Sequence, residues 1–282
     1  MKLRRMPAVK IIAASLAVAL LPISTGTLHA ADQPQQRKTA LVMLGNVDTW
    51  HIATEQVDAV AGLLTGYCNL AANFSDRPAD FTFENARRYN VIILYAALSP
   101  DAQNQQHTKE ALQNIFRAVE AGTPLLAIHG GIHNATVYGG TEINEKIGSR
   151  YVNAAHFPYQ RFNIKVAKGH PITAGVSDFR VSDEPYLIEM LARDAQILAS
   201  YDARVVSISS PFRPGLAGAS RDSLLLNHKW AEKTAESPLM YARTLGKGRI
   251  VMNALGHDGE ALRSPVYRTL TQQSLQWLFS GQ

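Results

Sequence analysis

Apolar and amphipathic segments alternate along the first half of the chain. Helical spacing is clearest where Leu112, Ile115, Phe116 and Val119 recur at i, i+3, i+4 and i+7, with Gly122 and Pro124 beyond the expected end. A second helix is expected through 57–64, and short apolar segments typical of buried strands lie at 39–44, 68–74, 91–96 and 124–128. Repeated strand–helix–strand units with buried strands predict a parallel sheet with helices on both faces.

The second half of the chain is less regular. Segments at 162–166, 197–201 and 205–209 have the pattern of strands with little helix between them, which predicts a β-rich insertion packed beside the main sheet. The alternation then returns, with a strand at 249–254, a loop at 256–258 and a helix at 265–279. We therefore predict a single domain over residues 39–281, preceded by a flexible leader at 31–38.

Residues 1–30 have the pattern of a signal peptide. Four basic residues precede an apolar run at 11–23, and Ala30 closes a small-residue cleavage site. The run contains Pro22 and is shorter than the ~20 residues of a membrane span, although an uncleaved anchor stays as the alternative. Cleavage predicts a periplasmic or secreted protein that is not attached to a membrane, and both Sec and twin-arginine export stay open.

Removal of this segment changes the charge of the chain. The full sequence has 28 Lys and Arg against 23 Asp and Glu, a net charge of +5. Since residues 1–30 contain four of the basic residues and none of the acidic ones, the mature chain has 24 basic and 23 acidic residues and a net charge of +1. No basic cluster remains, so nucleic acid is not expected as a partner.

Cys68 is the only cysteine in the sequence, so an internal disulfide is excluded. A lone thiol in an exported protein is either buried as a small hydrophobe or reactive. Because Cys68 falls in a predicted strand, we favour the buried thiol.

Polar and titratable side chains follow several of the predicted strands. In open parallel sheets, ligands bind outside the carboxyl ends of the strands. The strand at 124–128 runs into a glycine turn at His129, the kind of bend at which α/β enzymes often place a nucleophile. Three loops at this edge carry a histidine: Asn46, Asp48, Trp50 and His51 after the first strand, His129 with its glycines, and His257 with Asp258 after the last strand. Together they predict a functional site.

Each of these loops also has a structural interpretation. His129 can hydrogen-bond a backbone carbonyl and hold the turn, and Trp50 with His51 can begin a helix. In the last loop, either Asp258 orients His257 as a base or ligand, since a carboxylate fixes the imidazole tautomer, or the loop is an ordinary turn and Asp258 or Ser264 with Pro265 starts the final helix.

Further candidates lie in the second half. Glu184 and Tyr186 can grip sugar hydroxyls or act as acid and base, although adjacent carboxylates such as 183 and 184 usually form a solvated face. His156 lies in a loop before Phe-Pro. His170 precedes a proline, which predicts an extended turn and a structural role.

Several of these stretches occur in the order found in the trehalose-utilisation, or ThuA-like, family, which the chain resembles. The stretches are 127–131, 156–158, 169–175, 183–186 and 245–258, and they span most of residues 39–281. The resemblance implies an α/β, flavodoxin-like open parallel sheet related to class I glutamine amidotransferases. In those enzymes the turn carries a catalytic Cys, partnered by a His near the end of the chain. Here the turn carries His129, and the late histidine matches His257.

An amidotransferase reaction is not expected, because an imidazole cannot replace the thiolate and Cys68 lies far upstream of the turn. We expect instead a protein of carbohydrate utilisation that acts on a sugar or keto-glycoside, by hydrolysis, isomerisation or elimination. The expected catalytic residues are His129, His257, Asp258 and Glu184. The expected substrate-binding residues are Asn46, Asp48, Trp50, His51, His156 and Tyr186.

Other hypotheses stay open. A divalent metal such as zinc can be bound by His129, His156 and His257, or by a subset of them with Glu184, although no local ligand motif joins these residues. The protein can also be a non-catalytic module that binds a sugar or another small ligand. A structural partner of a secreted complex is a third class, which a large exposed apolar patch would mark. The oligomeric state does not follow from the sequence.

Overall fold

The structure, a computed structural model, describes residues 36–44, 53–95, 102–152, 159–204, 206 and 236–281. All described helices and strands belong to the unit that begins at Arg37. The predicted signal peptide and most of the leader lie outside the described residues, as do Asn46, Asp48, Trp50, His51 and His156 and nearly all of the strand expected at 205–209. Among the described helices, none has the length and apolar character of a membrane span.

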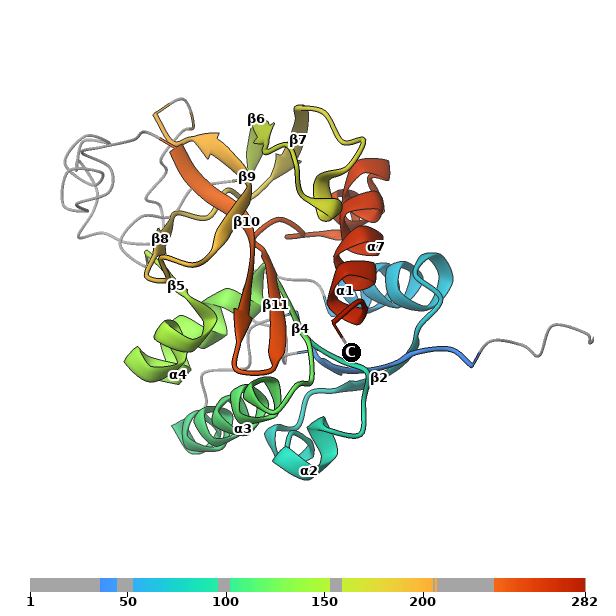
Figure 1. Ribbon diagram of the computed structural model, residues 1–282, viewed down its shortest axis with the longest axis vertical. Coiled ribbons are helices and arrows are strands. Elements are labelled where there is room, and N and C mark those ends of the chain that lie inside the picture. The colour runs from blue at the N-terminus through green and yellow to red at the C-terminus, as the bar shows by residue number, and fades with distance from the viewer. Residues whose placement is uncertain are drawn as a thin grey trace, which may run out of the picture. The chain divides into compact units, whose positions relative to one another are not determined.

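Five parallel strands form one half of the main sheet (Figure 1). Their order is β2–β1–β3–β4–β11, which is the flavodoxin-like order with β11 as the fifth strand. The strands β3 and β4 are buried along their whole length, as their continuous apolar sequences predict. The bounds are Thr39–Met43 (β1), Ala71–Ser75 (β2), Val91–Leu94 (β3), Leu125–Ile128 (β4) and Gly248–Asn253 (β11). The predicted parallel sheet is confirmed.

The second half of the chain extends this sheet. From β11 onward the pairing is antiparallel, in the order β11–β10–β9–β6–β7, and the short strands β5 and β8 pair separately. The expected β-rich insertion is present, but it is part of the main sheet and does not pack beside it. The reason is the hairpin between β10 and β11, which gives β9 a free edge to join. The bounds are Ser149–Tyr151 (β5), Gln160–Val166 (β6), Phe179–Asp183 (β7), Ile188–Met190 (β8), Gln196–Asp202 (β9) and Glu236–Leu245 (β10).

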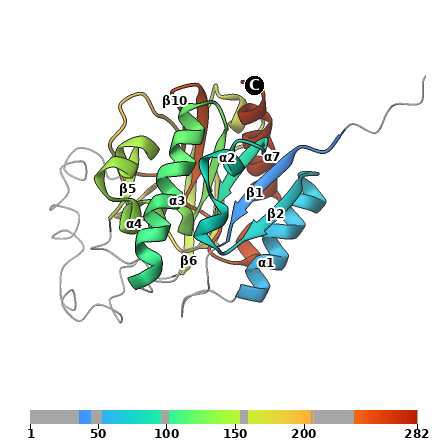
Figure 2. The ribbon, with the colours of Figure 1, turned by 90° about the horizontal axis from the view of Figure 1, so that it is seen from below.

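Helices cover both faces of the parallel half, as expected (Figures 1 and 2). The helices α2, α3 and α4 pack together on one face, and α1, α6 and α7 lie on the other. The apolar stripe of α3, with Leu112, Ile115, Phe116 and Val119, is fully buried. The bounds are Ala53–Ala61 (α1), Phe83–Ala86 (α2), Ala102–Glu120 (α3), Gly130–Ile147 (α4, broken at Gly140), Gly259–Arg263 (α6) and Pro265–Phe279 (α7), with short turns η1 (Gly62–Tyr67), η2 (Pro78–Asp80) and η3 (Pro171–Thr173).

The placement of Cys68 on a strand is wrong. The π-helical turn η1 continues α1 to Tyr67, Cys68 caps it, and β2 begins only at Ala71. The turn extends this far because Leu63 and Leu64 are buried in the core. Burial raises the pKa of the Cys68 thiol to about 12, so the thiol stays protonated and packs as a small hydrophobe.

Candidate functional site

His129 lies at the sharp turn between β4 and α4, and its backbone conformation is unusual. Its φ of 39° and ψ of −107° lie outside the regions that non-glycine residues favour. A backbone held in such a region costs on the order of 1–3 kcal/mol and is often found at functional sites. The His129 N–H donates to the Asn253 carbonyl at 2.8 Å, which ties the turn to β11. The predicted strand that runs into a sharp turn at His129 is confirmed, and the helix α4 that follows was not predicted.

Gly131 allows this turn to pack closely against the neighbouring strand. A Cβ placed on Gly131 would lie 2.4 Å from the carbonyl oxygen of Leu94, at the end of β3. A backbone atom at that distance leaves no room for any side chain. The second glycine after His129 is therefore required by the approach of α4 to β3.

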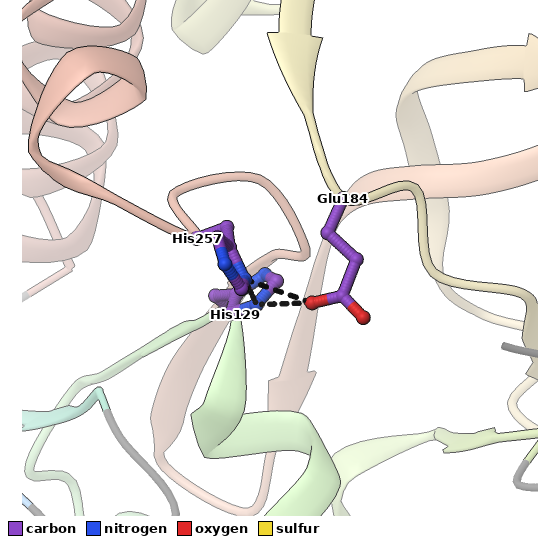
Figure 3. Close-up of side chains that lie close together, drawn as sticks. All are labelled: His129, Glu184 and His257. Atoms are coloured by element: carbon purple, nitrogen blue, oxygen red, sulfur yellow. Dashed lines mark hydrogen bonds and ion pairs between the residues drawn. The ribbon is translucent and has the colours of Figure 1, made fainter. Parts of the chain in front are cut away.

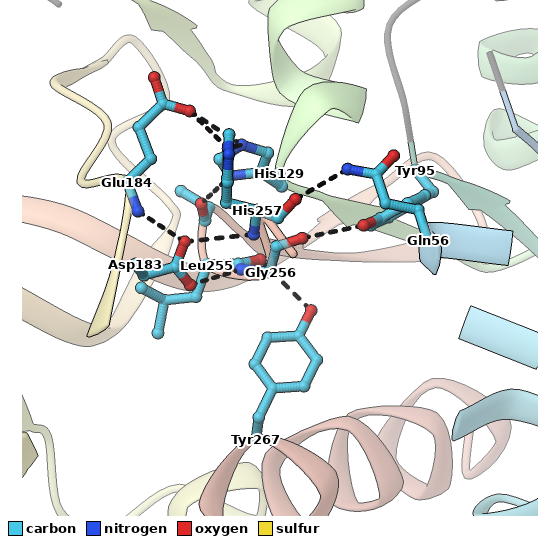
Figure 4. Close-up of polar contacts among 10 residues, drawn as sticks. Gln56, Tyr95, His129, Asp183, Glu184, Leu255, Gly256, His257 and Tyr267 are labelled. Atoms are coloured by element: carbon cyan, nitrogen blue, oxygen red, sulfur yellow. Dashed lines mark hydrogen bonds and ion pairs between the residues drawn. The ribbon is translucent and has the colours of Figure 1, made fainter. Parts of the chain in front are cut away.

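The loop after β11 carries His257 and is held by hydrogen bonds to its backbone (Figure 4). Gly256 has a φ of 110°, which a residue with a side chain rarely adopts. The three successive carbonyls of the loop each accept a hydrogen bond: Leu255 from the Tyr267 hydroxyl at 3.3 Å, Gly256 from the Tyr95 hydroxyl at 3.0 Å, and His257 from the Gln56 amide at 2.8 Å. The backbone that carries His257 is thus held by hydrogen bonds from α1, from α7 and from the residue after β3.

Asp183, at the end of β7, joins this loop to the segment that carries Glu184. The Asp183 side chain is fully buried and accepts three backbone hydrogen bonds, from Glu184 at 2.7 Å, Gly256 at 2.7 Å and His257 at 3.1 Å. Burial raises the pKa of Asp183 to about 7, against the opposing effect of these hydrogen bonds. Glu184 is also buried, so the two carboxylates do not form the solvated face that such pairs usually form.

One atom from each of three side chains converges on the same point (Figure 3). Oε2 of Glu184 lies 2.8 Å from Nδ1 of His257 and 3.3 Å from Nε2 of His129. The two ring nitrogens are 3.3 Å apart. His129 is 2% exposed, whereas the side chain of His257 is 20% exposed and provides the more open side of the cluster.

Hydrogen bonding assigns the tautomer of His129. Its Nδ1 lies 2.8 Å from the carbonyl oxygen of Ala254, and a carbonyl can only accept, so Nδ1 carries the hydrogen. In the neutral ring, Nε2 therefore presents a lone pair toward Glu184 and His257. The hydrogen bond from His129 to a backbone carbonyl, the structural alternative for this residue, is present, and the other ring nitrogen faces Glu184 and His257.

The charge state of His257 is set by opposing effects. Burial lowers the pKa of His257, while the hydrogen bond and charge of Glu184 raise it, with smaller contributions from Asp183 and Asp258. The raising effects together exceed the effect of burial, so the pKa of His257 lies above its ordinary value.

The expectation that Asp258 orients His257 needs correction. Glu184 makes the carboxylate contact to the His257 ring, and Asp258 caps α6, where its Oδ1 accepts the Ala261 N–H at 2.9 Å. Asp258 also hydrogen-bonds the Tyr159 hydroxyl, and it acts on the His257 ring through its charge. The alternative that Asp258 starts a helix is the one that the structure supports.

His170 has the structural role expected of it. The residue caps the short turn η3, and its Nδ1 accepts the Ile172 N–H at 3.1 Å. It contacts Trp277 of α7 and is not part of the cluster around Glu184.

Two aromatic side chains lie beside the cluster. Tyr186, an expected substrate-binding residue, packs on the His129 ring with 4.2 Å between centroids and is 5% exposed. Tyr159 is 41% exposed, and its ring centroid lies 5.8 Å from that of His257. The exposed aromatic face next to the histidines therefore belongs to Tyr159, which the sequence did not single out even though it directly follows the 156–158 stretch.

The structure thus brings together four of the ten expected site residues, namely His129, Glu184, His257 and Tyr186. Asp258 lies beside them as a helix cap. The remaining five, Asn46, Asp48, Trp50, His51 and His156, lie outside the described residues, so their roles stay predictions. Asp183 is an additional residue, and its burial was not evident from the sequence.

Comparison with known families decides the identity of the chain. Residues 39–278 match the family described as trehalose utilisation, ThuA. The chain belongs to the ThuA family. The match covers every described strand and all but the last residue of α7, and the resemblance noted in the sequence is confirmed.

Several solved structures are similar to this ThuA-family protein at low sequence identity. A putative ThuA-like protein from Bacteroides uniformis ATCC 8492 is 13% identical, with a TM-score of 0.64 over 89% of this chain and 95% of that one. A cytoplasmic protein from Salmonella typhimurium LT2 is 16% identical, with a TM-score of 0.53 over 86% and 99%. A glutamine amidotransferase from Thermotoga maritima is 11% identical, with a TM-score of 0.47 over 86% and 89%. No curated protein matches the sequence.

The ThuA-family site of this chain has no cysteine at its turn. Cys68 caps η1, before β2, and its thiol is kept protonated by burial. The thioester chemistry of an amidotransferase therefore has no nucleophile at His129.

Proposed function

We propose that this protein is a carbohydrate-processing enzyme that acts on a sugar or keto-glycoside at the cluster of His129, Glu184 and His257. Membership of the ThuA family supports a role in trehalose utilisation. The observation that carries the proposal is the convergence of one atom from each side chain, with separations of 2.8, 3.3 and 3.3 Å.

Glu184 and His257 form an acid–base pair in this proposal. At 2.8 Å, a proton passes directly between Oε2 and Nδ1. On a keto sugar, such a pair removes a proton from the carbon next to the carbonyl, and on a glycoside it protonates the leaving oxygen or activates a water. His129 turns Nε2 toward both groups and supplies a third polar contact to the reacting atoms.

Tyr159 supplies an apolar face for the substrate in this proposal. Its exposed ring lies beside His257, the more open of the two histidines. Small-ligand sites typically combine such an apolar surface with a few convergent polar groups, and a sugar ring presents both apolar C–H faces and hydroxyls. Asn46, Asp48, Trp50, His51 and His156 remain the further proposed contacts to the substrate.

The test is a turnover screen of the mature protein with disaccharides and their 3-keto forms, with products detected by mass. We expect turnover of at least one of these compounds and its loss in His257→Ala and Glu184→Gln. The matched control is Glu142→Gln, since Glu142 is an exposed carboxylate on α4. Its variant should turn over substrate at the wild-type rate.

Two results would count against an enzyme. If no compound is converted but a sugar binds and Tyr159→Ala abolishes that binding, the protein is a non-catalytic binding module. If turnover is found and is unchanged in both site variants, the chemistry lies elsewhere on the molecule.

We also propose that the protein is exported to the periplasm or secreted. Support comes from the basic start, the apolar run at 11–23 and the small residue Ala30. The Salmonella protein described as cytoplasmic is similar to this chain in fold alone, so its location does not indicate where this chain is found.

A further inference from the structure

The contact between His129 and Glu184 places two electron-rich atoms face to face. Nδ1 of His129 donates to the Ala254 carbonyl, so the neutral ring turns the lone pair of Nε2 toward Oε2 of Glu184, 3.3 Å away. A lone pair and a carboxylate oxygen repel each other at this distance unless positive charge lies between them. The same two atoms also face Nδ1 of His257.

One proton cannot form a hydrogen bond between every pair of these three atoms. A hydrogen on Nδ1 of His257 bonds Glu184 along the 2.8 Å side but leaves Nε2 of His129 facing the carboxylate. A cation bound by all three atoms accepts the lone pair of each, whereas protons alone would require a second one on Nε2 of His129, which makes this buried ring an imidazolium. For metal–ligand bonds of about 2.0–2.2 Å, neighbouring ligands in tetrahedral or octahedral geometry lie about 2.8–3.6 Å apart. The three observed separations, 2.8, 3.3 and 3.3 Å, fit this range.

The donor set indicates the kind of ion. Two imidazoles and one carboxylate suit zinc and the neighbouring transition metals, while calcium and magnesium prefer oxygen ligands. Catalytic zinc sites use three protein ligands of this kind and leave a position for water or substrate. His257 lies on the more open side of the cluster, where that position would be reached.

The surroundings of the ligands resemble those of a metal site. A metal-bound histidine almost always donates its other N–H to a carbonyl or carboxylate, and His129 donates to Ala254 at 2.8 Å. Asp183 holds the backbone of both Glu184 and His257 through hydrogen bonds of 2.7 and 3.1 Å. The three ligand atoms are thus held in place by the fold.

We propose that Nε2 of His129, Oε2 of Glu184 and Nδ1 of His257 bind one divalent transition-metal ion of the zinc class, with an open position for a substrate oxygen. The inference rests on the proposed function only in that both assign a role to these three side chains; with an ion bound, Oε2 and Nδ1 are its ligands and do not exchange a proton with each other. His156, which lies outside the described residues, is not needed for it.

The test is direct metal binding by the full chain after dialysis against a chelator. Titration with Zn²⁺, followed by calorimetry and by elemental analysis of the gel-filtered protein, should show about one ion per chain and a higher Tm. Substitution with Co²⁺ should give visible d–d absorption typical of a mixed nitrogen and oxygen ligand set. His257→Ala and Glu184→Gln should each weaken Zn²⁺ binding by at least about tenfold. The matched controls are His170→Asn and Glu142→Gln, which should bind as the wild type does.

Some results would overturn the metal site. Absence of Zn²⁺, Co²⁺ and Mn²⁺ binding would do so, as would binding that is unchanged in both site variants. Metal-free protein with full sugar turnover would overturn the metal site and leave the proposed function standing. Specific binding of about one ion that both site variants weaken, in a protein that converts no sugar, would support the metal site and contradict the proposed function.

Discussion

Oε2 of Glu184 lies 2.8 Å from Nδ1 of His257, although the two residues belong to different segments of the sheet edge. Glu184 follows β7 in the antiparallel half, and His257 follows β11 in the parallel half. The buried carboxylate of Asp183 accepts the backbone N–H of both residues, which brings the two loops together (Figure 4). The site therefore depends on the extension of the sheet by β10, β9, β6 and β7.

Glu184→Gln should remove most of the activity with little change in the fold. The amide has the size of the carboxylate but neither its charge nor its basicity, so we expect kcat to fall by roughly 10²–10⁴-fold. Steady-state kinetics on the sugar identified by the screen, with circular dichroism to check folding, measures this. The exposed Glu142→Gln serves as the control. A kcat equal to that of the wild type would remove Glu184 from the chemistry.

Asp183→Asn should weaken the site through its backbone contacts. The amide group replaces one acceptor oxygen with an N–H₂ donor, which cannot bond the N–H of Gly256 or His257. We expect the free energy of unfolding to fall by about 1–3 kcal/mol, because a buried donor loses its partner. We also expect metal affinity or activity to fall by about 10–100-fold, as is typical for an outer residue that orients a ligand.

Urea unfolding and Zn²⁺ titration of the same Asp183→Asn preparation separate these two effects. Reduced stability with unchanged binding and turnover would show that Asp183 stabilises the fold without positioning Glu184 and His257. If the unfolding free energy and the Zn²⁺ affinity both equal those of the wild type, the three hydrogen bonds of Asp183 neither stabilise the fold nor position the site.

Gly131→Ala should destabilise the protein through a backbone collision. The added methyl group would meet the Leu94 carbonyl at 2.4 Å, so α4 or β3 must move. Overpacking of this kind costs about 1–3 kcal/mol, which urea unfolding resolves. Gly62→Ala, in the helical turn η1, has no atom within 4 Å of the new methyl group and should be neutral or stabilising by up to about 1 kcal/mol. Equal stabilities for the two variants would contradict the close approach.

Export predicts a specific mature N-terminus. If the signal peptide is cleaved after Ala30, the protein recovered from the periplasm or the medium begins at Ala31. Mass spectrometry of the intact secreted chain measures this, and removal of residues 2–30 should keep the protein in the cytoplasm. A full-length chain in the membrane fraction would instead support an uncleaved anchor.

The parallel half of the fold could be predicted because its signals are local. Buried strands such as β3 and β4 are continuous apolar runs, and the stripe on α3 has helical spacing. The bend at His129 was evident from the strand that runs into two glycines. The antiparallel extension was not, because the partner of a strand such as β9 depends on which sheet edge is free, and that is a property of the whole fold.

The sequence predicts the two histidines and Glu184 of the site, but not which carboxylate contacts His257. Asp258 is adjacent to His257 in sequence, yet its carboxylate caps α6, and Glu184, which directly follows β7, makes the contact to the ring. Adjacent carboxylates such as Asp183 and Glu184 are usually solvated, so the local sequence does not predict the burial of both. Asp183 bonds the loop after β11, 73 and 74 residues further along the chain, and no local pattern encodes such a long-range contact.

His170 should make the stability of the protein fall at mildly acidic pH. Its Nδ1 accepts the Ile172 N–H, which requires the neutral ring, and burial followed by the charge of Arg249 lowers the pKa of His170 in the folded state. The unfolded chain, with a histidine pKa of about 6.5, therefore takes up the proton more readily, and stability decreases as pH falls below that value. His170→Asn keeps a good capping residue but does not titrate. Urea unfolding at about pH 8 and about pH 5 should show a larger loss of unfolding free energy in the wild type than in His170→Asn, because all other titrating groups are common to both proteins. Parallel pH profiles for the two proteins would show that protonation of His170 is not coupled to folding.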